Sequence, residues 1–168
     1  STDLLVNAAS VFARRGYVVV MPLRRGFGAT GGEFAEDPGT CANPDYLKGE
    51  QAAADDVMAA YEYARALPYV DANRVILAGQ SAGGHLALWL AGTGLVAGAV
   101  SLAGVCDLTG AARSGIGDGA ALELVGGSPD ECPDDYRLAD PLLRLPVGVP
   151  QLLVHGDADD RVPIELSR

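Results

Sequence analysis

The residues with the clearest chemical potential in this 168-residue chain are Gly79-Gln80-Ser81-Ala82-Gly83. A short apolar run, Val75 to Ala78, precedes them, and an apolar helical pattern over Gly84 to Ala91 follows. A strand, a G-x-S-x-G turn and a helix in this order are typical of a nucleophile elbow, which presents a serine hydroxyl on a strained turn. Ser81 is therefore predicted to attack a carbonyl carbon. The Ala82 N–H, at the start of the helix, is expected to stabilise the oxyanion that develops.

The glycines that flank Ser81 have a physical reason in this arrangement. The strand and the helix of such an elbow approach each other closely, so no side chain is expected to fit at Gly79 or Gly83. The apolar run Val75 to Ala78 has the continuous hydrophobicity of a strand that is buried on both faces of a parallel sheet.

The elements that would position this turn alternate between helix and strand. Apolar residues at helical spacing predict helices over residues 3–15 and 50–67, with apolar faces made of Leu5, Ala8, Ala9 and Phe12 and of Ala54, Val57, Tyr61, Ala64 and Leu67. Short apolar runs predict further buried strands at Tyr17–Met21, Gly98–Leu102 and Gln151–His155. This alternation implies right-handed crossovers, so the predicted fold class is α/β, a mostly parallel sheet flanked by helices.

The composition restricts the class of protein and its partners. Hydrophobic residues make up 49% of the chain and charged residues 20%, which is typical of a globular domain. The net charge of −10 argues against a nucleic-acid partner or an anionic membrane surface, and no apolar run approaches transmembrane length. The three cysteines, Cys41, Cys106 and Cys132, lack metal-ligand spacing. We expect no metal and no organic cofactor, while the compartment and the oligomeric state stay open.

The elbow in this setting resembles the α/β-hydrolase superfamily. R-R-G-Y-V-V-V-M-P-L-R-R-G-F-G-A-T-G-G (14–32) and L-P-Y-V-D-A-N-R-V-I-L-A-G-Q-S-A-G-G (67–84) resemble its prolyl-oligopeptidase-like and dienelactone-hydrolase-like serine hydrolases. V-H-G-D-A-D-D-R-V-P (154–163) is similar to the acid-bearing turn of the same enzymes, whereas S-L-A-G-V-C-D-L (101–108) onward looks closer to small esterases. The resemblance implies a partial α/β-hydrolase domain over residues 1–168, incomplete at both ends, with strands four to seven of the fold. Residues 107–148 would be a cap-like insertion between the sixth and seventh strands, at the pocket mouth.

The resemblance also implies a triad acid directly after the seventh strand. Asp159 is the assigned residue and Asp160 the alternative, with Asp107, after the sixth strand, as a second choice. A carboxylate here accepts the Nδ1–H of a histidine, fixes its tautomer and stabilises the imidazolium that forms when the serine is deprotonated. An Asp-rich segment of this kind also suits a solvated turn. Arg161 resembles a substrate-contacting arginine, and a salt bridge to a neighbouring aspartate is its alternative role.

The histidine of the triad is expected after an eighth strand, beyond the acid. The chain contains only His85 and His155. His85 is expected to point into the core or the helix packing, and His155 ends the seventh strand, where the family often has a structural His-Gly. Neither is expected to act as the general base, so we predict little or no triad-dependent turnover by these 168 residues alone.

Together these features predict a serine hydrolase that cleaves a carboxylic ester or an amide through an acyl-enzyme on Ser81. A small carboxylic ester is the favoured substrate, and a peptide the alternative. A prolyl-oligopeptidase-like peptidase and a non-catalytic relative are the competing hypotheses for the activity. A dinucleotide-binding domain is disfavoured, because no G-x-G-x-x-G follows a predicted strand. Arg25 is expected to brace the long loop over residues 23–49 and not to contact substrate.

Overall fold

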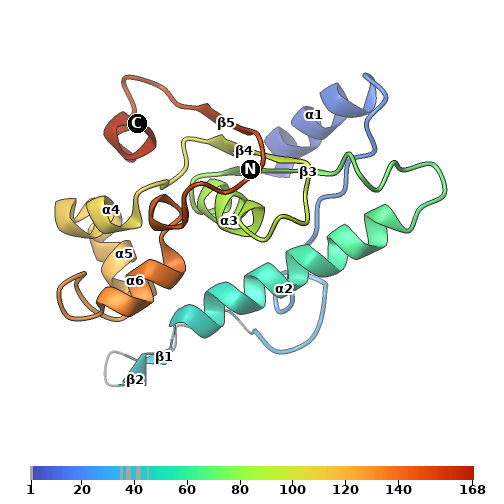
Figure 1. Cartoon of the computed structure of the whole chain (residues 1–168). Helices are drawn as coiled ribbons and strands as arrows, with labels where there is room; N and C mark the ends of the chain where they lie inside the picture. The colour runs from blue at the N-terminus through green and yellow to red at the C-terminus, as the bar shows by residue number, and fades with distance from the viewer. Residues whose placement is uncertain (1, 35, 37–38, 41–42, 45) are drawn as a thin grey trace.

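The computed structural model describes residues 2–34, 36, 39–40, 43–44 and 46–168, and side chains from Val6 onward except at 35 and 37–47. The helices are α1 (Thr2–Ala13), α2 (Tyr46–Arg65), α3 (Ala82–Ala91), α4 (Leu108–Ser114), α5 (Ala120–Val125) and α6 (Pro133–Ala139), with the 3₁₀ helices η1 (Ile116–Gly119), η2 (Leu142–Arg144) and η3 (Ile164–Ser167). The strands are β1 (Gly39–Thr40), β2 (Asn43–Pro44), β3 (Ile76–Gln80), β4 (Gly98–Leu102) and β5 (Gln151–Val154). Figure 1 shows their arrangement.

The central sheet has the order β3-β4-β5, and both strand pairs are parallel. The register pairs Gln80 with Leu102 and Leu102 with Val154, so the three strands end at the same edge of the sheet. Helix α3 connects β3 to β4, and the insertion from α4 to η2 connects β4 to β5. The α/β fold class predicted from the sequence is confirmed.

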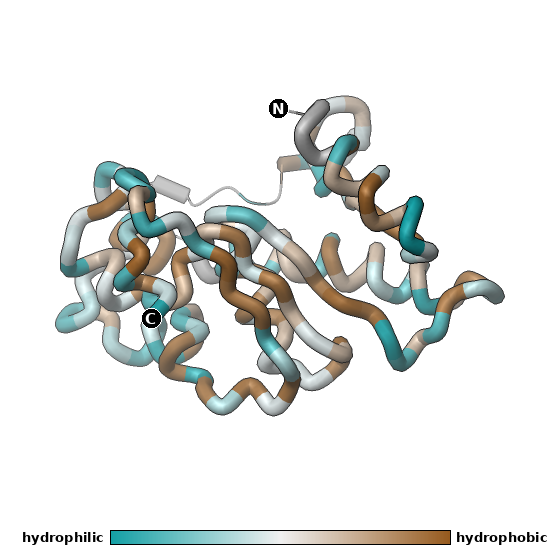
Figure 2. Tube along the Cα trace, turned by 90° about the horizontal axis from the view of Figure 1, so that it is seen from above, coloured by the Kyte–Doolittle hydropathy of each residue, from teal (hydrophilic) through white to brown (hydrophobic). Residues whose placement is uncertain are grey.

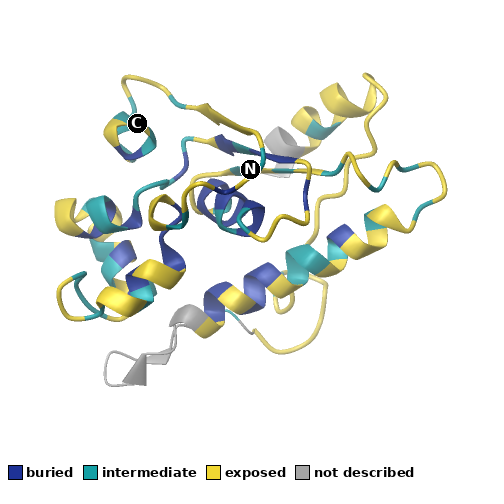
Figure 3. Ribbon diagram, viewed as in Figure 1, coloured by how far each residue is buried: buried dark blue, intermediate teal, exposed yellow. Residues whose placement is uncertain are grey.

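One face of this sheet carries the hydrophobic core. Helix α3 packs on β3 and β4, and α2 packs against α3 (Figure 3). The predicted apolar face of α2 is confirmed, because Ala54 and Tyr61 are buried and the Tyr61 hydroxyl donates to Leu95 O at 2.7 Å. The core on this side combines residues from α2, α3 and β4 with the segment before β4, namely Tyr61, Leu88, Ala91, Val96 and Ala99.

The opposite face of the sheet is open, which contradicts the prediction of strands buried on both faces. Ile76 in β3 is 51% exposed, and all four residues of β5 are exposed (Figure 3). Three of these four residues are apolar, and Figure 2 shows the hydropathy along the chain. Helix α1 does not cover them, since its described side chains are themselves exposed apart from the half-buried Ala9. An apolar run in a sequence shows that a strand is hydrophobic, but cannot show which elements lie on its two faces.

Residues Tyr17–Met21 do not form the predicted strand. They are irregular, and their side chains are between 37% and 56% exposed. A β-strand requires a backbone partner, and none of the described strands pairs with this segment. Its described ring contact is local, between Phe12 and Tyr17 at a centroid distance of 5.8 Å. The prediction of a strand at Tyr17–Met21 was therefore wrong, although the β-branched composition favours one.

The loop after this segment is anchored on α2, as predicted for Arg25. The Arg25 backbone N–H donates to Asp56 Oδ2 at 2.7 Å, and its guanidinium pairs with Asp56 Oδ1 at 2.6 Å. The guanidinium of Arg24 pairs with the carboxylate of Glu36, which lies before α2. Gly26 permits a tight turn, because an added Cβ would lie 2.5 Å from Phe34 Cα. The remainder of the predicted 23–49 connection lies partly outside the described residues.

The insertion between β4 and β5 forms a small hydrophobic cluster beyond the carboxyl ends of these strands (Figure 1). Its buried members come from α4, α5 and α6 together with one residue of η3: Leu108, Ala111, Ala112, Ala121, Val125, Tyr136, Ala139 and Leu166. Asp140 is fully buried at the end of α6 and accepts from the N–H and hydroxyl of Thr109, which joins α6 to α4. The insertion is thus a packed unit and not a flexible connection.

Among the described helices, none combines the length and the apolar character that crossing a membrane requires. The described side chains also contain no group of three or more His, Cys, Asp or Glu residues placed to hold a metal ion.

Candidate active site

Ser81 lies on the strained turn that the sequence predicts. It joins β3 to α3 with φ of 55° and ψ of −123°, a combination that side-chain-bearing residues rarely adopt and that costs about 1–3 kcal/mol. The Ser81 N–H donates to Leu102 O at 2.9 Å, and its carbonyl accepts from the N–H groups of Gly84 and His85. These backbone bonds hold the turn in place, and the residue itself is exposed.

The close approach of strand and helix is present, but the glycines that permit it are not both those predicted. An added Cβ at Gly79 would lie 2.0 Å from Gly83 O, so Gly79 is required. At Gly83 an added Cβ would meet nothing within 4 Å, and that part of the prediction is wrong. Gly84 is the second crowded position, with Ser101 Oγ at 2.6 Å. Each helical residue is rotated by about 100° from the last, and position 84 is the one that faces the sheet.

Ala82 is the first residue of α3 and is exposed. The first N–H groups of a helix have no acceptor within it and point outward with the positive end of the helix dipole. The position of Ala82 therefore fits the oxyanion role given to its N–H, which stays a prediction.

Asp159 lies in the turn after β5, and its carboxylate is held by the backbone. Its Oδ1 accepts from the N–H groups of Val162 and Arg161, both at 2.9 Å. These two hydrogen bonds are the main cause that lowers the pKa of Asp159, and the nearby His155 and Arg161 contribute less. Asp159 is therefore a carboxylate at neutral pH, as a triad acid must be.

Ser81 and Asp159 are brought to the same edge of the sheet. Ser81 follows the last residue of β3, and Asp159 lies five residues beyond the last residue of β5. Only β4 separates these parallel strands, so their ends are two strand spacings apart, roughly 10 Å. The fold thus brings two residues that are 78 positions apart in the sequence beyond the ends of two strands that have only β4 between them.

His85 is engaged away from Ser81. Its side chain is buried between α2 and the loop after β4, with Nε2 at 2.9 Å from Glu50 Oε1 and Nδ1 at 3.0 Å from Val105 O. The expectation that it points into the helix packing is confirmed. The sequence carried no signal for Glu50 as its partner, because the two residues are 35 positions apart.

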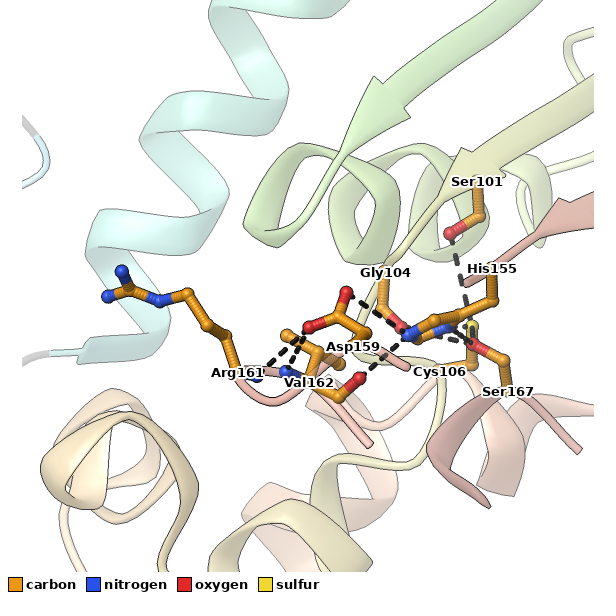
Figure 4. A network of polar contacts seen from close by, with 8 residues as sticks. All are labelled: Ser101, Gly104, Cys106, His155, Asp159, Arg161, Val162 and Ser167. Carbon is orange, nitrogen blue, oxygen red and sulfur yellow. Dashed lines mark hydrogen bonds and ion pairs between the residues drawn. The ribbon is translucent and has the colours of Figure 1, made fainter. Parts of the chain in front are cut away.

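His155 is likewise engaged, as Figure 4 shows. Its Nδ1 lies 2.7 Å from Ser167 Oγ and its Nε2 lies 2.7 Å from Val162 O, while its side chain is only 4% exposed. Both ring nitrogens thus have hydrogen-bond partners, one in the turn between β5 and η3 (residues 155–163, the acid turn) and one in η3. Among the described residues, no hydrogen bond joins either histidine to Ser81.

Residues 5–167 match the family model of the prolyl oligopeptidase family. The chain belongs to this family. A protein of Aspergillus terreus described as "Probable dipeptidyl-peptidase 5" is 34% identical over 164 residues, which cover 93% of this chain and 21% of that protein. The chain therefore spans about a fifth of the length of the curated relatives that it matches.

Two solved structures show the same fold. The acylaminoacyl peptidase of Pyrococcus horikoshii superposes with a TM-score of 0.58 at 25% identity, over 73% of this chain and 20% of that one. A puromycin-hydrolyzing peptidase of Mycobacterium tuberculosis superposes with a TM-score of 0.60 at 26% identity, over 69% and 18%. The predicted resemblance to prolyl-oligopeptidase-like α/β-hydrolases is confirmed.

Two other candidate residues, Asp107 and Arg161, form hydrogen bonds within their own segments of the chain. Asp107 is the N-cap of α4, and its side chain accepts from Gly110 N at 2.6 Å. This carboxylate therefore stabilises the start of the helix. Arg161 is exposed, its backbone N–H binds Asp159, and its guanidinium points away from that carboxylate (Figure 4). Within the described part of the chain no ion pair joins Arg161 to Asp157 or Asp160. Its role toward substrate stays a prediction.

Two cavities of this family member lie away from Ser81. One, of about 250 Å³, is lined by residues of α2, α3, α6 and η2: Glu50, Gln51, Trp89, Arg137, Leu138 and Arg144. A smaller one, of about 150 Å³, has Cys106 and Ser167 among its lining residues. Cys106 Sγ is 3.5 Å from Ser167 Oγ, a contact that no spacing in the sequence suggested.

Proposed function

We propose that this chain carries the nucleophile and the acid of a serine peptidase, and that Ser81 attacks the carbonyl carbon of a peptide bond. The observation that supports this proposal best is the placement of Ser81 on a strained, exposed elbow at the sheet edge where the ionised Asp159 also lies. The elbow at Ser81 is formed by a local motif. The placement of Asp159 at the same sheet edge depends on the fold, since Asp159 follows a separate strand.

In the proposed reaction, the Ser81 oxygen forms a bond to the carbonyl carbon while a histidine takes its proton. The tetrahedral oxyanion is stabilised by the Ala82 N–H, and its collapse expels the amine, which receives the proton from the imidazolium. Water then hydrolyses the acyl-enzyme and releases Ser81. Asp159 stabilises the imidazolium in both halves of the reaction. The histidine in this proposal is neither His85 nor His155, because both are engaged elsewhere.

The proposed substrate is a peptide or a related amide. The relatives are described as a dipeptidyl-peptidase, an acylaminoacyl peptidase and a puromycin-hydrolyzing peptidase, which favours an amide over the small ester that the sequence alone suggested. Esters pass through the same tetrahedral intermediate, so an activated ester is expected to serve as an artificial substrate. Residues 107–148 are proposed as a cap-like insertion beside the substrate, and Arg161 as a contact for it.

The proposal is tested on the polypeptide encoded by the complete reading frame that contains these residues. Hydrolysis of dipeptide and N-acylated amino-acid 4-nitroanilides is measured for the wild type and for Ser81→Ala and Asp159→Asn. We expect kcat to fall about 10⁶-fold for the serine variant and about 10⁴-fold for the aspartate variant. Ser10→Ala is the control, since Ser10 is exposed on α1 and its hydroxyl donates within that helix, to Val6 O. Equal rates for wild type and Ser81→Ala would refute the proposal.

A non-catalytic relative is the second candidate, and the engagement of both histidines is the observation that favours it. It predicts that none of the three variants changes hydrolysis. For the 168 residues alone, we predict little or no triad-dependent turnover. A burst of product from this chain that Ser81→Ala abolishes would contradict that prediction.

A further inference from the structure

A buried histidine, His155, joins the acid turn to η3 through hydrogen bonds. His155, the first residue after β5, reaches across the turn to Val162 O through Nε2, and to Ser167 Oγ in η3 through Nδ1, both at 2.7 Å (Figure 4). The imidazole is almost fully buried, so these contacts are shielded from water. The turn that carries Asp159 is therefore closed over a histidine.

The partners of His155 fix its tautomer. A carbonyl oxygen only accepts hydrogen bonds, so Nε2 must carry the hydrogen that it donates to Val162 O. Nδ1 of the neutral ring then has a lone pair, and the single hydrogen of the Ser167 hydroxyl has two acceptors within reach, Nδ1 at 2.7 Å and Gly104 O at 3.3 Å. The shorter contact assigns this hydrogen to Nδ1. The lone pairs of Ser167 Oγ remain available to Cys106 Sγ, 3.5 Å away, which ties the turn to the loop after β4.

Val162 connects His155 to Asp159. Its N–H donates to Asp159 Oδ1 at 2.9 Å, and its carbonyl accepts from His155 at 2.7 Å. One residue is thus held at both its backbone groups, by the acid on one side and by the imidazole on the other. The second carboxylate oxygen, Oδ2, lies 3.6 Å from His155 Nε2, too far for a hydrogen bond.

We infer that His155 is a positioning residue for Asp159. Its Nε2–H holds the Val162 peptide so that the Arg161 and Val162 N–H groups point at Oδ1, which leaves Oδ2 as the oxygen for the catalytic histidine. This inference rests on the proposed function, in which Asp159 is the triad acid. The inference itself concerns the geometry and ionisation of the carboxylate, and both are measurable without turnover.

The test is NMR spectroscopy of the 168-residue chain with three variants. His155→Asn places its amide near the Nδ1 position and loses the donor to Val162, whereas His155→Gln reaches the Nε2 position and keeps that donor. Ser167→Ala is the matched control, because it removes the Nδ1 partner and leaves the Val162 contact. The readouts are the pKa of Asp159 from its carboxyl carbon shift and the hydrogen exchange of the Arg161 and Val162 amides.

We expect His155→Asn to raise the pKa of Asp159 toward the ordinary value and to accelerate exchange of both amides. His155→Gln and Ser167→Ala should keep both readouts close to wild type. An Asp159 pKa and amide exchange unchanged in a folded His155→Asn would overturn the inference, because a purely packing role moves neither.

The tautomer of His155 in the wild type keeps the inference testable even where a variant fails to fold. Nitrogen NMR of the imidazole should show a hydrogen on Nε2, and an Nε2 without a hydrogen would overturn the inference. Failure of the proposed function has a different signature. Asp159→Asn would then leave hydrolysis by the complete polypeptide unchanged, whatever the NMR results for His155.

Discussion

The contact between Gly79 and the start of α3 allows a quantitative prediction for the elbow. An added Cβ at Gly79 would lie 2.0 Å from Gly83 O and 2.2 Å from Gly83 C. The first distance is roughly 1.4 Å short of the 3.4 Å at which ordinary contact begins. Both atoms belong to backbone and not to a flexible side chain, so the clash is relieved only if the beginning of α3 moves away from β3.

Gly79→Ala should therefore be costly. Overpacking of this kind costs about 1–3 kcal/mol where side chains can adjust, and we expect about 3 kcal/mol here because backbone must move. For a chain of this size, that loss lowers Tm by about 6–12 °C. Thermal and urea unfolding followed by circular dichroism measure the effect.

Gly83→Ala is the matched control for this prediction. The added methyl group meets nothing within 4 Å, and φ at Gly83 is not in the left-handed region. Alanine in a helix is more favourable than glycine, so we expect a gain of about 0.5–1 kcal/mol. A Gly79→Ala variant as stable as wild type, or a Gly83→Ala variant destabilised as much as Gly79→Ala, would refute the reasoning about the elbow.

Three further predictions concern ionisable groups. The pKa of Asp159 is lower in the folded chain than in the unfolded one. The contribution of the Asp159 carboxylate to stability is therefore present above about pH 4 and is lost as the pH falls through the folded-state pKa. In urea titrations, the difference in unfolding free energy between wild type and Asp159→Asn should shrink below about pH 4. Burial raises the pKa of Tyr136 to about 12, so its contribution is complete below about pH 10 and is lost as the pH rises through 12. Tyr136→Phe, which loses the hydrogen bond to Gly127 O, should cost about 1 kcal/mol, and ultraviolet difference absorbance should show phenolate formation by Tyr136 only near pH 12. Glu50→Ala, which leaves the buried His85 without its carboxylate, should cost about 3 kcal/mol in chemical unfolding, and a change under 0.5 kcal/mol would contradict a structural role for the pair.

The elbow was predictable from the sequence because its determinants are local. Ser81 needs a positive φ, Gly79 needs the absence of a side chain, and the apolar runs on either side encode a strand and a helix. The family resemblance, and not local reasoning, assigned Asp159 as the acid, and that role stays a prediction. Local reasoning failed at Gly83, since the face that α3 turns to the sheet depends on how the helix docks.

Features that depend on contacts between distant segments were not predictable. Tyr17–Met21 has the composition of a strand, but whether it becomes one depends on a neighbour with which to pair. The exposure of β5 depends in the same way on what covers the sheet. Glu50 as the partner of His85 follows from the packing of α2 on α3, and no spacing in the sequence encodes it.

The insertion shows an intermediate case. Ser128-Pro129-Asp130-Glu131 forms the two reciprocal hydrogen bonds of a capping box, between Ser128 N and Glu131 Oε2 and between Glu131 N and Ser128 Oγ. Nevertheless, these bonds close a turn, and α6 begins only at Pro133. The Ser-x-x-Glu pattern thus accounts for these hydrogen bonds but not for the position at which the helix begins.

The central claim is that Ser81 is the nucleophile of an acyl-transfer site, and its most direct test is to trap a covalent adduct. The polypeptide encoded by the complete reading frame is incubated with a fluorophosphonate, and the modified residue is identified by peptide mass spectrometry. We predict a single adduct on Ser81 that is absent in Ser81→Ala and much slower to form in Asp159→Asn. Labelling of another serine, or no labelling while peptide hydrolysis proceeds, would contradict the account.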